Sequence, residues 1–555
     1  MSTTATTTVQ PPTPFTNGEN YLIGGEIRTW SGKFEHVYSP VTTINPQDQT
    51  QVKYHIGNYA FMTEKEAEEA VQAAVTAFDK GRGEWPCYST EKKIECMQKF
   101  TEGLLAKREE IVNLLMWEIC KNRSASEQEV DRTIQYIRDT IKELSKLETH
   151  QSKIISVGGI STQVKRSPLG VVLCIAPFNY PFNETYTTLI PALLMGNVVI
   201  LKTPRTGGLC HLPTLELFKN CFPPGAVNVI HGSGRETLPP MMKTGLIDVL
   251  AFIGTHNAAN SLINAHPNLY KLRNVLGLDA KNAGFVLPEA DIDVAVSECA
   301  LGAFSYNGQR CTAQKILFVH ESIVDEFVAK FSKAVDALKM GYPWESGVSI
   351  TPLAEPQKPK ILREYIKEAV EKGAKIVNER GQLFANDTET NPEKRIDRGS
   401  SALFAPTVLY PVTSDMKIYH EEQFGPVTPI VSYSTLQELE DYITSTTFGQ
   451  QASVYIKTES GVAVNSEYFI PLVDLLTHHV SRININCQCQ RGPDSLPFTG
   501  RKNSATGTLS VYDALRAMSI RALVATKETG KNVGMLQEVI ESKKSHFLRE
   551  FNEHQ

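Results

Sequence analysis

The sequence predicts a multidomain α/β protein built on parallel sheets, and three observations support this class. Short apolar runs such as 171–176 (VVLCIA) and 198–202 (VVILK) alternate with helical stretches from Gly170 onward. Runs without polar alternation suit strands of a parallel sheet covered by helices on both faces, where nucleotides bind beyond the carboxyl ends of the strands. The length of 555 residues exceeds one ordinary core, so about two to four units are expected.

The ordered part of the chain is expected to open with a helix after Thr63. Thr63 and Glu66 form a capping-box pattern, and apolar residues then recur at helical spacing as far as Phe78. Strands and helices alternate from 171 to 254. A second α/β region follows Lys281, with a helix near 291–304 and a strand at 315–320, so we place a domain boundary near residue 281.

Three segments fall outside this alternation. Residues 1–20 are rich in Thr and Pro and are expected to form a disordered tail. Segments 152–164 and 482–487 are rich in β-branched residues and are expected to pair as an arm. Beyond Lys527, helical spacing predicts a C-terminal helix that docks on its own chain, with docking on a partner as the alternative. Its apolar residues are Met535, Val539, Ile540, Phe547 and Leu548.

Composition narrows the possible class of protein. Hydrophobic residues make up 41%, charged residues 21%, and the net charge is −5, which is typical of soluble globular chains. There is no basic block with interleaved aromatic residues, so no nucleic-acid partner is expected, and the apolar runs are too short to span a membrane. The ten cysteines show neither disulfide nor zinc spacing, so we expect a reducing compartment and no metal. The cytoplasm is the expected location, because the N-terminus resembles neither a signal peptide nor a transit peptide.

One cysteine has a context that points to chemistry. Cys311 lies in YNGQRCTAQK (306–315), on an expected turn between a helix and a strand, with Arg310 beside it. A thiol attacks as the thiolate, so a nucleophilic cysteine needs a cation or a helix end that lowers its pKa. A small buried apolar residue is the alternative interpretation of Cys311.

Four motifs in one order carry a family resemblance. They are SPLGVVLCIAPFNYPFNETYTTLIPALLMGNVVILKTP (167–204), FIGT (252–255), NGQRC (307–311) and EEQFGPV (421–427). In this order and spacing they resemble the aldehyde dehydrogenase superfamily over roughly residues 20–525. Four shorter stretches, EVDRT (129–133), PFNYP (177–181), GQRCTA (308–313) and QRGPDSLPF (490–498), are similar to its non-phosphorylating, NADP-dependent glyceraldehyde-3-phosphate dehydrogenases.

The resemblance implies an architecture for the whole chain. A Rossmann-type cofactor domain would take residues 21–150 and 166–281, and an α/β catalytic domain residues 282–480. A small β oligomerisation arm would take 151–165 and 481–500, with 501–527 returning to the core and 528–555 forming a helical extension. Such an arm implies a homodimer or a homotetramer.

The resemblance also implies a reaction. Cys311 would attack an aldehyde carbon, with Asn179 and the backbone N–H of Cys311 holding the oxyanion, and a thioester would remain after hydride transfer. Arg132, Arg310 and Arg491 would face a substrate phosphate, because a dianion calls for planar, permanently charged donors. The implied activity is NADP-dependent oxidation of glyceraldehyde 3-phosphate to 3-phosphoglycerate without inorganic phosphate.

The implied cofactor is NADP, with NAD possible. Lys202 would reach the adenosine ribose, and Arg205 favours a 2′-phosphate where NAD-preferring relatives often carry glutamate. Glu422 would bind the nicotinamide ribose. The other residues expected at the cofactor are Pro177, Phe178, Gly232, Gly234, Gly254, Thr255, Leu278 and Phe424.

The pattern breaks at the general base. The superfamily usually carries a glutamate 34 residues before its cysteine, and here that position is Gly277. General-base assistance is typically worth about a hundredfold to ten-thousandfold. Asp279 is the tentative replacement. The alternatives are release of the thioester to coenzyme A, by an acylating aldehyde or semialdehyde dehydrogenase, and a non-catalytic cofactor-binding scaffold.

Overall fold

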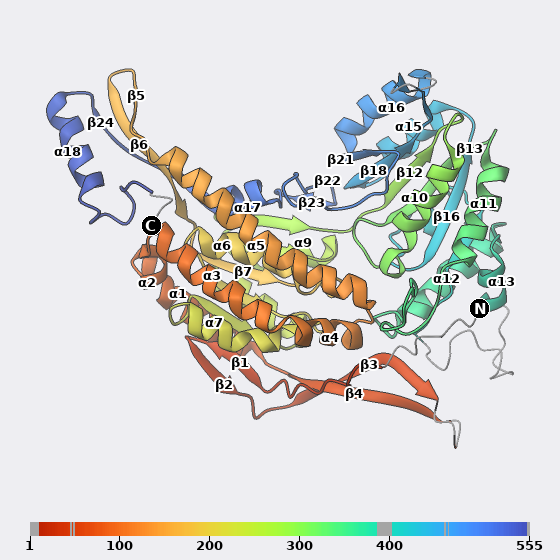
Figure 1. The fold of residues 1–555 in the computed structure, drawn as a ribbon, viewed down its shortest axis with the longest axis horizontal. Coiled ribbons are helices and arrows are strands. Elements are labelled where there is room, and N and C mark those ends of the chain that lie inside the picture. Colours follow the sequence, from red (N-terminus) through yellow and green to blue (C-terminus); the bar gives the residue numbers. More distant parts are fainter. Residues whose placement is uncertain are drawn as a thin grey trace, which may run out of the picture.

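A computed structural model describes residues 10–44, 47, 50–385, 402–459, 462–463 and 466–551. Figure 1 shows two α/β bodies side by side, with an extended arm at the end of the molecule far from the second body. Each body is built on one large sheet. The mixed α/β class with parallel sheets is therefore confirmed.

The first body contains an eight-stranded sheet in the order β2-β1-β9-β8-β7-β10-β11-β23. Its five central strands are parallel, and the strands at the two edges are antiparallel. The strands are β1 (Asn20–Ile23), β2 (Glu26–Thr29), β7 (Val171–Ile175), β8 (Val198–Lys202), β9 (Val227–Ile230), β10 (Val249–Ile253), β11 (Arg273–Gly277) and β23 (Ala505–Thr506).

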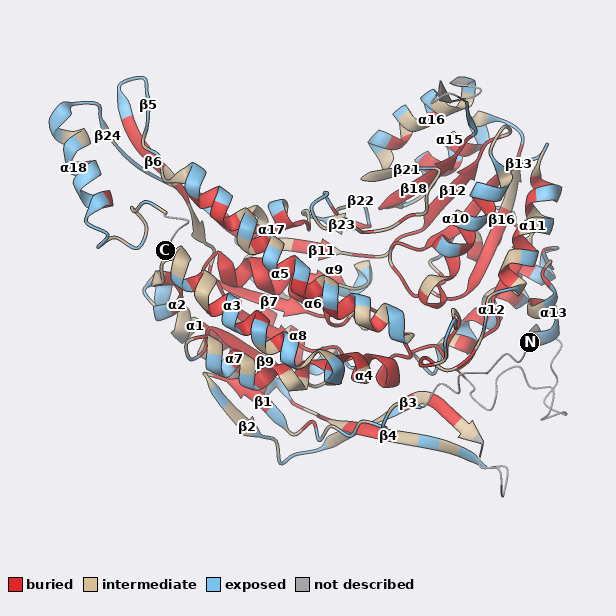
Figure 2. Ribbon diagram, in the orientation of Figure 1, coloured by how far each residue is buried: buried red, intermediate tan, exposed pale blue. Residues whose placement is uncertain are grey.

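Helices cover both faces of this sheet, which explains why its strands are apolar throughout (Figure 2). Val172 and Cys174 pack into one core, whereas Val171 and Leu173 pack into the other. The first core is formed with α3 (Thr90–Ala106), α4 (Arg108–Glu118), α5 (Arg123–Gln151), α6 (Asn183–Leu194), α7 (Leu215–Cys221) and α17 (Val511–Ala517). The second is formed with α1 (Glu64–Phe78), α8 (Gly234–Lys243) and α9 (His256–Ala265). The capping box of Thr63 and Glu66 starts α1, as predicted.

The second body contains a seven-stranded sheet in the order β14-β15-β16-β13-β12-β18-β21. All of its pairings are parallel except that of β14. The strands are β12 (Asn282–Val286), β13 (Gln314–His320), β14 (Lys375–Ile376), β15 (Thr407–Tyr410), β16 (Val427–Tyr433), β18 (Gln451–Tyr455) and β21 (Arg482–Ile485). The chain leaves the first sheet after Gly277 and enters the second at Asn282, where the boundary was predicted.

The second sheet also has helices on both sides, and short elements complete the chain. The helices are α10 (Ile292–Phe304), α11 (Val324–Asp336), α12 (Lys358–Glu371), α13 (Glu379–Ala385), α14 (Lys417–His420), α15 (Leu436–Ser445) and α16 (Ser466–His479). The remaining elements are α2 (Glu84–Cys87), β3 (Phe34–Ile44), β4 (Gln51–Ala60), β17 (Phe448–Gly449), β19 (Thr458–Glu459), β20 (Val462–Ala463) and β22 (Arg501–Lys502).

The pairing predicted for the arm is wrong. Segment 152–164 contributes β5 (Ile155–Val157) and β6 (Ile160–Pro168), but β6 pairs with β24 (Ser519–Lys527) over nine residue pairs. Segment 482–487 instead forms β21, which pairs in parallel with β18 and places Asn484 in the interior. β-branched composition indicates a strand but carries no register, so the two partners were indistinguishable in the sequence.

The N-terminal segment differs in part from the predicted disordered tail, whereas a C-terminal helix is present. Thr16 belongs to the predicted disordered tail, yet its N–H donates to Ile56 O at 3.0 Å, while residues 1–9 lie outside the described part. The C-terminal helix α18 (Gly530–Glu541) docks on its own chain, as predicted, burying Leu536 and Ile540. Within the described residues, no helix combines the length and the apolar character needed to cross a bilayer.

Candidate active site

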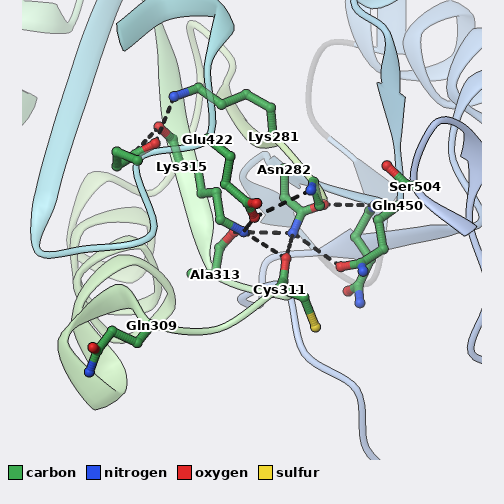
Figure 3. A network of polar contacts seen from close by, with 12 residues as sticks. Lys281, Asn282, Gln309, Cys311, Ala313, Lys315, Glu422, Gln450 and Ser504 are labelled. Atoms are coloured by element: carbon green, nitrogen blue, oxygen red, sulfur yellow. Dashed lines mark hydrogen bonds and ion pairs between the residues drawn. The ribbon is translucent and has the colours of Figure 1, made fainter. Parts of the chain in front are cut away.

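Cys311 lies in a loop between α10 and β13, at the boundary of the two bodies. Its carbonyl oxygen accepts hydrogen bonds from Asn282 Nδ2 at 2.8 Å and from Lys315 Nζ at 2.7 Å. Figure 3 shows the sulfur directed away from these polar contacts. The network therefore fixes the backbone of the loop and leaves the thiol half-buried and without a disulfide.

The resting thiol is not activated by its surroundings. Burial raises the pKa of Cys311 to about 11, and the negative charge of Glu184 adds to this effect. Lys315 and Arg491 act in the opposite direction, but they do not offset the burial. At neutral pH the cysteine is therefore a thiol, and its proton must leave before attack.

The contacts of the Arg310 side chain do not support its predicted role. Its Nη2 donates to Gly302 O at 2.7 Å and, at 3.4 Å, to Leu301 O, near the C-terminal end of α10. Carbonyl groups in the last turn of a helix lack partners within the helix, and a neighbouring cation satisfies them. The guanidinium is thus directed at the helix that precedes the loop, and neither the predicted contact with a phosphate nor activation of Cys311 is supported.

Asn179 contacts the loop that carries Cys311. Its side-chain Nδ2 donates to Gln309 O at 2.9 Å, two residues before Cys311. Its carbonyl oxygen accepts from Lys121 Nζ at 2.9 Å. The side-chain amide and the cysteine therefore lie on adjoining segments, where an oxyanion donor is needed.

A buried ion pair holds Asn179 in this position. Lys121 and Glu129 contact each other with both side chains 0% exposed. Glu129 Oε1 also accepts the backbone N–H groups of Phe182 and Asn183 at 3.0 and 3.1 Å, at the start of α6. The Lys121 ammonium also lies 3.4 Å from the ring centre of Tyr180. We did not identify this pair from the sequence, because a Lys and a Glu eight residues apart carry no distinctive pattern.

The two other predicted arginines meet at a pair of acids. Arg132 Nε and Nη2 donate to the two oxygens of Asp494 at 2.7 and 2.6 Å. Arg491 Nε lies 3.4 Å from Asp494, and Arg491 Nη1 donates to Glu184. Arg491 Nη2 is buried and has no hydrogen-bond partner in the described part of the chain. The cluster carries two positive and two negative charges. Both Nε and Nη2 of Arg491 lack a hydrogen-bond partner within the described residues, which leaves donors for a ligand.

Glu422 reaches the cysteine loop through Lys315. Its Oε1 lies 3.0 Å from Lys315 Nζ and accepts the Ala280 N–H at 3.3 Å. Burial raises the pKa of Glu422. Phe424 follows with a left-handed backbone, φ 46°, and its ring lies 5.7 Å from that of Phe178. Glu422, Phe424 and Phe178 are therefore assembled where the two bodies meet.

The other predicted cofactor residues share one edge of the first sheet. Pro177, Lys202, Gly232, Gly254 and Leu278 lie at or just beyond the carboxyl ends of β7, β8, β9, β10 and β11. Gly234 starts α8, and Thr255 caps α9 by accepting the Ala258 N–H at 3.3 Å. Helix N-termini at this edge favour phosphate groups.

Glycines at this edge fit a closely bound dinucleotide. Gly232 has φ +105°, and an added Cβ would lie 2.7 Å from Met62 O. At Gly254 a Cβ would lie 2.3 Å from the Phe252 ring. The turns therefore present backbone without side chains, as contact with a pyrophosphate requires.

Lys202 and Arg205 lie at the far end of this edge. Burial lowers the pKa of Lys202 to about 8. Arg205 is 70% exposed, and its Nε donates to Glu35 Oε1 at 2.9 Å. A 2′-phosphate would therefore compete with Glu35 for Arg205.

The Gly277 position, where relatives in the superfamily usually carry the general base, has room for a side chain. Gly277 ends β11, and an added Cβ would make only ordinary contacts with Ile253, at 3.5 and 3.7 Å. Asp279 Oδ2 accepts the His256 N–H at 2.6 Å and contacts His256 Nδ1 at 2.7 Å, so it caps α9 at the cofactor edge. This placement does not support Asp279 as the replacement base.

The site contains acids that we did not single out in the sequence. Glu184 lies five residues after Asn179, and Asp494 lies three residues after Arg491, both inside stretches that carried the resemblance. Both acids stand in recognisable motifs of the sequence. Their pairing with arginines depends on how α5, α6 and the 490–498 loop pack together, which the sequence does not give. In the described residues, no group of three or more His, Cys, Asp or Glu side chains could hold a metal ion.

Comparison with known proteins identifies the family of this chain. The model of the aldehyde dehydrogenase family matches residues 35–523. An NADP-dependent glyceraldehyde-3-phosphate dehydrogenase of Streptococcus equinus is 30% identical over 511 residues, covering 91% of this chain and 96% of that protein. A 3-sulfolactaldehyde dehydrogenase of Priestia aryabhattai is 26% identical, covering 79% and 86% of the two chains.

A solved structure shows the same fold. The NADP-dependent glyceraldehyde-3-phosphate dehydrogenase of Bacillus halodurans C-125, crystallised with NADP, superposes with a TM-score of 0.78 at 27% identity, covering 93% of this chain and all of that one. The family match spans both bodies and includes Asn179, Cys311 and Glu422. The chain belongs to the aldehyde dehydrogenase family.

Proposed function

We propose that this protein oxidises a small phosphorylated aldehyde, first of all glyceraldehyde 3-phosphate, to the carboxylic acid with NADP and without inorganic phosphate. The observation that carries the proposal is the hydrogen bond from Asn179 Nδ2 to Gln309 O at 2.9 Å. It joins the end of β7, on the cofactor edge, to the loop of Cys311. This contact supports a reaction in which Cys311 is the nucleophile and Asn179 the oxyanion donor, beside the edge proposed to bind the dinucleotide.

The chain's own residues account for the binding and acylation steps. Cys311 adds to the aldehyde carbon, and its thiol proton passes to solvent water. Asn179 Nδ2 and the backbone N–H of Cys311 hold the oxygen that becomes negative. NADP, when bound, supplies the hydride acceptor. Glu422 and Lys202 would hold its two riboses, and a thioester on Cys311 is the product of this half-reaction.

Arg205 favours NADP over NAD. A guanidinium binds a 2′-phosphate with paired donors, whereas Glu35 alone would repel it. A structural neighbour was crystallised with NADP. The Glu35 carboxylate is an internal stand-in for the phosphate, since it already takes both Nε and Nη2 of Arg205.

The substrate's anionic group is assigned to Arg132 and Arg491. Arg491 keeps a free Nη2, and Arg132 could exchange Asp494 for a phosphate. Two relatives are named for three-carbon aldehydes that carry phosphate or sulfonate. Replacing Arg132 by Ala should raise KM more for glyceraldehyde 3-phosphate than for uncharged glyceraldehyde. Equal effects on both would remove the phosphate role.

A coenzyme A-acylating activity is the second candidate, because Gly277 supplies no carboxylate for hydrolysis. We further propose a cytoplasmic homodimer or homotetramer that assembles through the arm of β5, β6 and β24. Exposed apolar side chains on the arm, Ile155, Val157 and Leu523, support this assembly.

One assay tests the activity. Purified protein is mixed with NADP and glyceraldehyde 3-phosphate, with and without coenzyme A, and NADPH absorbance is followed. Multiple turnover without coenzyme A supports hydrolysis. A single burst that continues only with coenzyme A would favour the acylating enzyme, and no NADPH with any of a panel of aldehydes would favour a scaffold. Cys311→Ser should abolish the burst.

A further inference from the structure

One buried carboxylate near the cysteine loop, that of Glu184, has no role in the steps described so far. Glu184 belongs to the first turn of α6, and its backbone N–H donates to Tyr180 O at 3.1 Å. The same short segment carries Asn179, which contacts the cysteine loop through Gln309. Glu184 is therefore held close to Cys311 by the geometry that positions the oxyanion donor.

The environment of Glu184 leaves one oxygen available. The residue is buried, with its side chain 8% exposed. Oε2 accepts from Arg491 Nη1, and no hydrogen bond to Oε1 occurs within the described residues. Arg491 thus fixes the orientation of the carboxylate, while its own Nη2 remains free beside it. Oε1 therefore remains an acceptor for a water molecule, whereas Nη2 stays available to the anionic group of the substrate.

We propose that Glu184 is the general base that releases the acid product, in place of the glutamate missing at Gly277. In this step Glu184 Oε1 takes a proton from water, and the water oxygen bonds to the thioester carbon. The C–S bond then breaks, and the proton passes from Glu184 to the leaving sulfur of Cys311. Water is the only co-reactant and no electrons are transferred, so the thioester becomes a carboxylic acid and a free thiol.

Other acids near the cysteine are engaged elsewhere. Asp279 caps α9 and contacts His256, and Glu422 is bound by Lys315 and the Ala280 N–H. The negative charge of Glu184 raises the pKa of the Cys311 thiol, which agrees with a position near the sulfur. Arg491 holds Oε2, so Glu184 keeps Oε1 for a water molecule.

The proposal rests on the proposed function and is tested by separating acylation from deacylation. Glu184→Gln keeps the size of the side chain and an oxygen for Arg491. Rapid mixing with NADP and glyceraldehyde 3-phosphate should still give a burst of about one NADPH per subunit, whereas steady turnover should fall at least a hundredfold. Intact-mass spectrometry should then show the acyl group on Cys311, and hydroxylamine should release it.

Matched variants make the result specific. Glu216→Gln changes an exposed acid in the first turn of α7 and should keep the wild-type turnover. Glu184→Asp should retain more turnover than Glu184→Gln, because it keeps a carboxylate. Gly277→Glu, placed where a Cβ makes only ordinary contacts, should restore turnover to the Glu184→Gln enzyme.

Three outcomes would overturn the inference. The first is unchanged steady turnover in Glu184→Gln, and the second is equal loss of burst and turnover, which would assign Glu184 a structural role. A wild-type enzyme that turns over only with coenzyme A would also overturn it. Wild-type protein that forms no NADPH with any aldehyde refutes the proposed function instead, so the two failures are distinguishable.

Discussion

The buried pair of Lys121 and Glu129 should control both the stability of the first body and the position of Asn179. Replacing Lys121 by Met keeps the length of the side chain but removes the ammonium. The change removes the contact with Glu129, the 2.9 Å hydrogen bond to Asn179 O and the contact with the Tyr180 ring. Glu129 would keep its two backbone donors but lose its counter-charge in a site closed to water.

The magnitude follows from the 0% exposure of both side chains. Breaking a fully buried ion pair by removing one partner typically costs about 3–5 kcal/mol, because the remaining charge stays buried. Replacing both partners costs less. We therefore expect the free energy of unfolding to fall by about 3 kcal/mol or more in Lys121→Met, and by less in Lys121→Met/Glu129→Gln than in the single variant.

Urea unfolding followed by tryptophan fluorescence measures these differences, because a shift of the midpoint at constant slope reports stability. The burst rate of NADPH formation reports the catalytic effect. Losing an oxyanion donor outright costs about a hundredfold to a thousandfold, so misplacing Asn179 should slow the burst by less than this but by at least about tenfold. If Lys121→Met unfolds like the wild type, or if the double variant loses the sum of the two single losses, the pair is not coupled and the reasoning fails.

Three further predictions test other parts of the site. Arg205→Glu should shift the ratio of kcat/KM from NADP toward NAD by at least about tenfold, since a carboxylate repels the 2′-phosphate; an unchanged ratio would contradict the assignment. Burial raises the pKa of Glu118, which accepts three backbone N–H groups of the Arg205 loop, to about 7. Because this folded-state pKa lies above the usual 4.5, its contribution to stability is complete below pH 4.5 and is lost as the pH rises through 7. The free energy of unfolding, measured by urea titration, should fall over this pH window by about 3 kcal/mol at most in the wild type. It should fall less in Glu118→Gln. Finally, the pKa of about 11 for Cys311 predicts that modification of the free enzyme by iodoacetamide accelerates steadily from pH 7 to 10. A rate that levels off below about pH 10 would show a thiol with an ordinary or lowered pKa and would contradict this prediction.

The sequence alone was sufficient for the fold class. Apolar runs such as 171–176 predicted the strands of a parallel sheet. Every side chain of a strand is buried only where helices cover both faces of its sheet. Cys311 and Asn179 were located because their motifs are local. The capping box at Thr63 also depends only on neighbouring residues, and it was found in place.

Long-range pairing could not be read from the sequence. Arg310 stands beside Cys311 in the chain, yet its guanidinium turns toward the end of α10, where carbonyl groups lack partners. Segment 482–487 joined the second sheet rather than the arm, since strand composition does not encode register. Asp279 was a reasonable base by position, and only the contact with His256 shows where it is directed.

By itself, the order of residues determined which segments become strands and helices and which residue types stand in each motif, because these properties are local. Only the tertiary structure decided which charges meet. Glu184 comes to Arg491 across 307 residues, and Arg132 to Asp494 across 362. Coulomb energy depends on distance in space and on exclusion of water, and neither quantity is a property of sequence spacing.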